Sequence, residues 1–334
     1  MRARIIVTLT WLAALGLALW ILTRLPLATV LQTLGDLRPW QWAAWIGLNL
    51  FIIALLTARW RVLTAAMALP VGFLQLLRIR QAGMVISFVT PGPQFGGEPL
   101  QVYWLWQRHA TPGPAAFLAV GLDRFYELWV NFTVLLLAVL SLLTAASVAF
   151  VDWRTLAVVL LGLVLTMAVS GWLLLRQPLR LREWIRRLTR PWRHQARLGR
   201  LKSHWSELNA ALQRLFAAQR PALAGALGLS LLAWVLLIGE FWFLLGVVGV
   251  PFDLTAYIFL FTVVRLAVLL PLPGGIGSVE AGLFWAFQAL ALPLSAAAGL
   301  ILLVRLRDAV ILLTGAVALP GLHAPVAPAD SSKQ

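Results

Sequence analysis

Cysteine is absent from this sequence, and charged residues and histidines are scarce. Without cysteine, the chain has no disulfide framework, no cysteine-ligated metal site and no thiol nucleophile. Charged residues make up 12% of the 334 residues, half of the roughly 25% that an ordinary globular chain carries. A soluble single domain is therefore excluded, because so few charges could not cover a surface in water. The histidines are too far apart for a recognisable ligand spacing, so we expect no metal site at His109, His194, His204 or His323.

Apolar sequence is what the chain has in quantity. Hydrophobic residues make up 61% of it and the mean hydropathy is +0.88, which predicts an integral membrane protein. Since a spanning helix needs about 20 apolar residues, we expect an all-α, polytopic helical membrane protein with about six full spans. Arg59 and Arg61 are expected to close the second span at the membrane surface. The predicted spans cover residues 5–23, 40–58, 114–145, 156–175, 222–248 and 296–319.

Positive charge is concentrated in one segment, residues 176–220. The net charge of the chain is +15, and this segment alone holds twelve lysines and arginines against two glutamates. Such a loop is typical of the cytoplasmic side and of contact with anionic lipid, so we expect no nucleic-acid partner. We expect a multi-pass protein of a bacterial-type inner membrane with both termini in the cytoplasm. Residues 1–320 are expected to form a single membrane domain, and residues 321–334 a disordered tail.

Glycine and proline interrupt two of the apolar segments. Proline removes a backbone donor and glycine disfavours a helix, so each cluster ends a helix within apolar sequence. Irregular backbone inside a membrane must be covered by protein or line a cavity. We therefore predict two re-entrant hairpins, at about residues 83–107 and 255–292. The breaks contain Pro91, Gly92, Pro93, Gly96 and Gly97 in the first hairpin, and Pro271, Pro273, Gly274, Gly275 and Gly277 in the second.

The two hairpins are predicted to enter the membrane from opposite faces. The order of the spans places the first hairpin on the cytoplasmic face and the second on the external face, as an inverted repeat would. Each break is followed by a glutamate and then by a helix that carries an arginine and an aspartate. These residues are Glu98 with Asp123 and Arg124, and Glu280 with Arg305 and Asp308.

Charged residues within the predicted spans form the candidate site. Each costs roughly 2.5–3.5 kcal/mol on insertion scales, so they are expected to face one another or a wet cavity. The arginines are candidates for holding an anionic headgroup, and the two hairpin glutamates for a proton-coupled or amine-binding role. The alternative is that these charges form internal salt bridges that only hold the hairpins in place. The predicted transport residues are Glu98, Asp123, Arg124, Glu127, Arg265, Glu280, Arg305 and Asp308, with Glu240 and Arg307 completing the set.

Catalytic motifs are missing from the sequence. There is no Gly-x-Ser-x-Gly elbow, no His-Glu-x-x-His pair and no phosphate-binding Gly-x-x-x-x-Gly-Lys-Ser/Thr loop. The glycines from Gly274 to Gly277 follow no predicted strand and precede no lysine, so they do not form a nucleotide loop. We therefore predict that the protein is not an enzyme and uses no cofactor.

The order of the two glycine motifs resembles a known family. The segment from Pro91 to Glu98 with Asp123-Arg124, followed by Pro271 to Glu280, is similar to the lysylphosphatidylglycerol synthase transmembrane region family, also called the flippase-like domain family or uncharacterised protein family 0104. The resemblance implies an all-helical inner-membrane protein. It also implies lipid handling, because the best understood members move aminoacylated phosphatidylglycerol between leaflets. Their additional soluble synthase domain is not expected in this chain.

Three functions remain open from the sequence. The leading hypothesis is a translocase that moves a phospholipid or lipid-linked substrate between leaflets by its polar headgroup. The second is an accessory protein that transports nothing and binds a lipid or an envelope biosynthesis enzyme through the basic loop. The third is a transporter of organic anions. The oligomeric state is not predicted.

Overall fold

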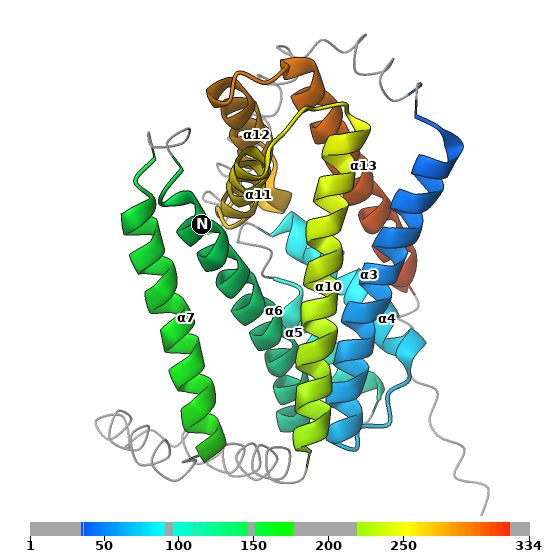
Figure 1. The fold of residues 1–334 in the computed structure, drawn as a ribbon. Helices are drawn as coiled ribbons and strands as arrows, with labels where there is room; N and C mark the ends of the chain where they lie inside the picture. Colours follow the sequence, from blue (N-terminus) through cyan, green and yellow to red (C-terminus); the bar gives the residue numbers. More distant parts are fainter. Residues whose placement is uncertain are drawn as a thin grey trace, which may run out of the picture.

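The computed structural model describes residues 35, 37–90, 96–109, 111–145, 151–176 and 219–320 (Figure 1). Within these ranges the chain is all helical, with no strand. The predicted first span, nearly all of the basic loop and the predicted tail lie outside the described residues, as do Pro91, Gly92 and Pro93 of the first break.

The described helices are of two lengths. Four of them are long and apolar enough to cross a membrane, and α13 is as long but carries three charged residues at its centre. An all-α polytopic membrane protein is therefore confirmed. These long helices are α3 (Pro39–Ala66), α6 (Gly113–Leu142), α7 (Trp153–Arg176), α10 (Arg220–Val247) and α13 (Leu294–Ala318).

The end of the second span was wrongly predicted. The helix does not end near Ala58, because α3 continues through Arg59 and Arg61 to Ala66. The side chain of Arg59 is completely buried within the protein. A buried arginine needs a carboxylate partner, and the sequence rule that assigns arginines to the interface does not take such a partner into account.

The short helices form two helix–break–helix units. The first consists of α4 (Phe73–Val89) and α5 (Glu98–Arg108), and the second of α11 (Leu254–Val268), the 3-10 turn η3 (Pro273–Gly275) and α12 (Ser278–Ala289). None of these helices exceeds 17 residues, which is fewer than the about 20 that a span requires. The first unit begins earlier than residue 83, because α4 starts at Phe73 and continues through Gly83 without a break.

The breaks of the two units touch each other. Gly274 adopts a φ of 56° in η3, a conformation that glycine tolerates better than other residues. A Cβ atom on Gly274 would lie 2.2 Å from the ring of Phe88, near the end of α4. Glycine at this position therefore permits both the turn and the close approach of the two hairpin tips.

The two halves of the chain form an internal repeat, in which equivalent residues are 181 positions apart. Helices α10, α11 and α13 each begin 181 residues after α3, α4 and α6, and α12 begins 180 residues after α5. The connections also correspond, because the turns after α3 and α10 place Ala68 and Gly249 at positive φ. Pro112 and Pro293 likewise occupy the same position before α6 and α13.

Contacts between α3 and α10 show how the two halves are related. The Nη1 atom of Arg59 donates to the Ser230 hydroxyl at 3.4 Å, and the Asn49 amide donates to Glu240 at 2.9 Å. Arg59 is equivalent to Glu240, and Asn49 to Ser230, so the two contacts are reciprocal. Reciprocal contacts of this kind are the signature of a two-fold axis. The two helices run antiparallel along each other (Figure 1), as an inverted repeat requires.

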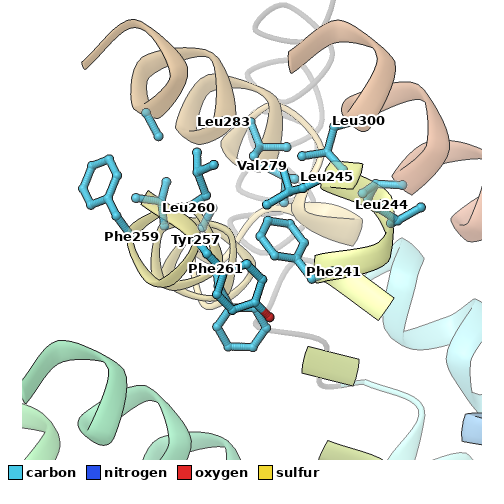
Figure 2. Close-up of a cluster of buried hydrophobic side chains, with 14 of the residues drawn as sticks. Phe241, Leu244, Leu245, Tyr257, Phe259, Leu260, Phe261, Val279, Leu283 and Leu300 are labelled. Atoms are coloured by element: carbon cyan, nitrogen blue, oxygen red, sulfur yellow. The ribbon is translucent and has the colours of Figure 1, made fainter. Parts of the chain in front are cut away.

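A large apolar cluster packs the second unit in place. Figure 2 shows Phe241 of α10 beside Phe261 of α11, and their ring centroids are 5.7 Å apart. Leu283 of α12 and Leu300 of α13 are completely buried in the same cluster. In contrast, α7 packs mainly on α6 and exposes apolar residues such as Val158, which suits a helix that faces lipid.

Equivalent interfaces of the two halves are not packed equally. Helix α13 lies closely along α4, where a Cβ atom on Gly315 would lie 2.4 Å from the Gln81 carbonyl oxygen. The equivalent pair is Val134 in α6 and Thr262 in α11, and α6 packs against α11 far less extensively. Among the described residues, the α4–α13 interface is therefore closely packed and the α6–α11 interface is packed less closely.

The contact between the hairpin tips predicts the effect of Gly274→Ala. A Cβ atom would collide with Phe88 and would hold a non-glycine residue at positive φ, which costs about 1–3 kcal/mol. We expect a lower thermal unfolding midpoint in detergent. Gly239→Ala in α10 is the control, because no atom lies within 4 Å of its added Cβ. Equal midpoints for both variants would show that the tips do not meet as described.

Candidate functional site

Ionisable side chains gather where the hairpin tips meet the long helices. All eight transport residues predicted from the sequence belong to this charged cluster, together with Glu240 and Arg307. Much of the cluster lines a cavity of about 260 Å³ to which every described helix except α7 contributes. Its arginines are Arg59, Arg80, Arg124, Arg265, Arg305 and Arg307, and its carboxylates are Glu98, Asp123, Glu127, Glu240, Glu280 and Asp308.

In the first half, an arginine of α6 holds the start of α5. Arg124 donates from Nε to Glu98 at 2.6 Å and from Nη1 to Glu127 at 2.8 Å. The second oxygen of Glu98 accepts from the Gly96 backbone amide at 2.8 Å. The helix dipole favours a carboxylate at this position, in the first turn of α5. The ion pair therefore connects the hairpin break to the middle of the next long helix.

The second half repeats this arrangement. Arg305 of α13 donates to both oxygens of Glu280, at 2.5 and 2.8 Å, and to Asp308 at 2.7 Å. Glu280 lies in the first turn of α12 and accepts from the Gly277 backbone amide at 2.8 Å. Arg305 also donates to the carbonyl oxygens of the η3 turn. It therefore pairs with carbonyl groups that the break removes from the helix hydrogen-bond pattern.

A third ion-pair group was not predicted from the sequence. Asp123 accepts from Arg59 at 2.8 Å and from Arg80 at 2.5 Å, and all three side chains are buried. The Nη2 atom of Arg59 also lies 3.5 Å from Glu127. This group joins α3, α4 and α6. The 181-residue repeat is the sequence signal that could have revealed Arg59, since Arg59 occupies the position in the first half that is equivalent to Glu240 in the second.

Glu240 is the centre of a fourth group. It accepts from Trp45 at 3.1 Å and from Asn49 at 2.9 Å, and its second oxygen accepts from Arg307 at 3.4 Å. Arg307 lies 3.7 Å from Asp308, beyond hydrogen-bond distance. The shortest ion pair of Arg307 is therefore longer than the shortest ion pair of each of the other paired arginines.

Arg265 differs from the other five arginines. It lines the cavity from α11, and among the described residues it takes part in none of the ion pairs that the other five arginines make. Its guanidinium carbon lies 4.4 Å from the centre of the Trp234 ring and 5.3 Å from that of Phe261. Contact with aromatic faces stabilises the cation but leaves its N–H groups available.

Apart from Asn49, Ser87 and Gln101, the side chains that form the rest of the cavity wall are apolar. These side chains come from both halves, so charged and apolar side chains line one space. Within the described ranges, no three His, Cys, Asp or Glu side chains are arranged to hold a metal ion. The apolar wall includes Ile52, Ile53, Leu56, Leu237, Phe241, Leu244, Val264, Val268, Ile311 and Leu312.

Comparison with known proteins agrees with this architecture. The family model for the lysylphosphatidylglycerol synthase TM region matches residues 4–315. The chain belongs to this family. A relative, the UPF0104 membrane protein of Methanothermobacter thermautotrophicus (strain Delta H), is 27% identical over 266 residues, which cover 76% of this chain and 77% of that protein. No solved structure matches the chain significantly. The match confirms the family that the glycine motifs predicted. It also agrees with a membrane protein.

The Asp123 group predicts a large effect on stability. Asp123→Ala would leave Arg59 and Arg80 buried without their carboxylate, and loss of one partner of a buried pair costs about 3–5 kcal/mol. We expect a matching fall in the detergent unfolding midpoint. Asp152→Asn, at an exposed carboxylate that caps α7, is the control. A midpoint as high as that of the wild type would contradict the assignment of Asp123 as the shared partner of both arginines.

Proposed function

We propose that this protein moves lipids with a polar headgroup between the two leaflets of its membrane. The headgroup passes through the cavity between the hairpin tips while the acyl chains remain in the bilayer. The observation that carries this proposal is the composition of the cavity, in which ion-paired arginines and carboxylates share one space with an apolar wall. A site for a fully polar solute would not need such a wall.

The broken helices support the proposal. Units of two short helices that enter from opposite faces bring irregular backbone to mid-membrane, where it must line a cavity. The tips of the two units touch at Phe88 and Gly274. The hairpins are thus proposed to be re-entrant, with the charged cluster near the centre of the bilayer. In this location the ion pairs offset the cost of placing charge inside the bilayer.

The unequal interfaces support alternating access. An inverted repeat can exchange the conformations of its halves, so the α4–α13 side opens when the α6–α11 side closes. In the described state, Gly315 of α13 contacts the α4 backbone, whereas α6 and α11 are less closely packed. The proposed movement is passive or coupled to an ion gradient, with Glu98 or Glu280 gaining a proton as access changes.

The proposed setting is a bacterial-type inner membrane with both termini in the cytoplasm. The basic segment 176–220 would then lie on the cytoplasmic face, where it can contact anionic lipid. We propose no catalytic role, because the charged cluster described above consists of ion pairs rather than a nucleophile with its base.

Leaflet exchange in proteoliposomes tests the proposal. Headgroup-labelled phosphatidylglycerol and phosphatidylethanolamine are followed with an impermeant quencher, in the wild type, Glu98→Gln and Glu280→Gln. Each variant loses a charge-assisted hydrogen bond, worth about 1.5–3 kcal/mol, and a group that can exchange a proton. We expect protein-dependent quenching beyond the outer-leaflet half in the wild type, and exchange roughly tenfold slower or more in both variants.

The control variant is Asp152→Asn, which removes an exposed carboxylate outside the charged cluster. It should exchange lipid at the wild-type rate. Wild-type protein that is no more active than empty liposomes would contradict translocation of these lipids and favour an accessory protein that only binds its partner. Normal exchange in both glutamine variants would contradict the role of the hairpin carboxylates.

Gly315→Leu tests alternating access. A larger side chain would collide with Gln81 and Val85 of α4, so it should disfavour the closed α4–α13 side. Because the chain has no cysteine, Met84→Cys introduces a single thiol in the cavity wall. We expect Gly315→Leu to change the side of the membrane from which an impermeant maleimide labels this thiol fastest. Gly162→Leu in α7, where nothing lies within 4 Å of the added Cβ, should leave labelling unchanged, and the same sidedness in both variants would contradict alternation.

A further inference from the structure

We infer that Arg265 is the docking point for a phosphate-type oxyanion inside the cavity. The inference rests on the proposed function for one step, the assignment of this oxyanion to a lipid headgroup. The oxyanion site itself is argued from the contacts of Arg265, and it would stand for any phosphate-bearing ligand that enters the cavity.

Local charge pairing sets Arg265 apart. Arg124 and Arg305 each hold two carboxylates, and Arg59 and Arg80 share Asp123. The charged cluster has as many carboxylates as arginines, but the carboxylates are paired with the other arginines and none is paired with Arg265. Arg265 cannot lose its proton, and a half-buried cation without a hydrogen-bonded carboxylate is costly. An incoming anion would supply the missing partner.

Aromatic contact holds the guanidinium in a defined orientation. Trp234 is buried in α10, and its ring centre lies 4.4 Å from the Arg265 guanidinium carbon. An arginine that stacks on a ring keeps its planar N–H groups free for bidentate hydrogen bonds. Such a fork fits two oxygens of a phosphate group. The contact with Trp234 thus stabilises the cation without occupying its donors.

A second cation strengthens the case. Arg307 lines the same cavity, and its like charge repels that of Arg265, whereas the carboxylates of Glu240 and Glu127 attract it. Arg307 makes its hydrogen bond to Glu240 at 3.4 Å, longer than the ion pairs of Arg305 at 2.5 and 2.7 Å. An anion between Arg265 and Arg307 would remove this repulsion. It would also bind Arg307, whose own ion pairs are long, at 3.4 and 3.7 Å.

The surroundings of Arg265 are apolar. Phe241 and Phe261, both labelled in Figure 2, line the cavity together with Val264 and Val268. Exclusion of water strengthens a charge-assisted hydrogen bond to a guanidinium. The same wall can cover the glycerol and first methylene groups of a lipid. Phosphate is the oxyanion common to phospholipid headgroups. A phospholipid would therefore fit both the guanidinium of Arg265 and the apolar wall beside it.

Binding measurements on the purified protein test the site without requiring transport. Calorimetric titration would use three probes: dihexanoyl phosphatidylglycerol, dihexanoylglycerol, which lacks phosphate, and inorganic phosphate. We expect Arg265→Gln to weaken phosphatidylglycerol binding roughly tenfold or more, and Arg265→Lys to weaken it less, since lysine keeps the charge but not the fork. Trp234→Leu, which keeps Arg265, should also weaken binding. Arg78→Gln, which removes an exposed arginine from α4, should bind as the wild type does.

The outcomes separate the site from the proposed function. Binding of phosphatidylglycerol that is equal in Arg265→Gln and the wild type, with both folded by their unfolding midpoints, would overturn the site. Inorganic phosphate that binds as tightly as the lipid, with the same dependence on Arg265, would support the oxyanion site and contradict a lipid ligand. Binding that depends on Arg265 in a protein that exchanges no lipid would keep the site and overturn translocation.

Discussion

Charge that is buried among apolar helices must be paired, and this constraint organises the molecule. In each half a glutamate at the start of the returning short helix pairs with an arginine in the middle of the next long helix, Glu98 with Arg124 and Glu280 with Arg305. The pair fixes where the break lies, because the backbone amide before each glutamate donates to the same carboxylate. The helices around the breaks then enclose a cavity in which the remaining charges face one another.

The inverted repeat explains why both halves contribute charged residues to one cavity. Equivalent positions of α3 and α10 carry opposite charges, Arg59 and Glu240, and each contacts the partner half through a reciprocal hydrogen bond. Those two contacts are related by a two-fold axis between the halves. Around that axis the packing is unequal, with α13 close to α4 and α6 less close to α11. The equivalent helices have the same spacing in the sequence but pack differently in the structure. Under the proposed alternating access, the two halves would exchange these two packing arrangements.

The sequence was sufficient for some of these features and not for others. Glycine and proline within apolar segments predicted the two broken units, because such residues disfavour helices wherever they occur. Insertion cost predicted that the charges inside spans would cluster. The interfacial rule failed for Arg59, since nothing in the local sequence reveals that Asp123 lies beside it. The isolation of Arg265 likewise depends on which carboxylates the other arginines occupy, and this is decided by tertiary packing alone.

The central claim is that a lipid headgroup enters the cavity between the hairpin tips. Its most direct test is photocrosslinking in proteoliposomes with a phospholipid that carries the reactive group on its headgroup, followed by mass-spectrometric mapping of the adducts. The account predicts adducts on cavity-lining residues of α11 and α13, such as Val264 and Ile311. Adducts confined to outward-facing residues such as Val158 of α7 would contradict it.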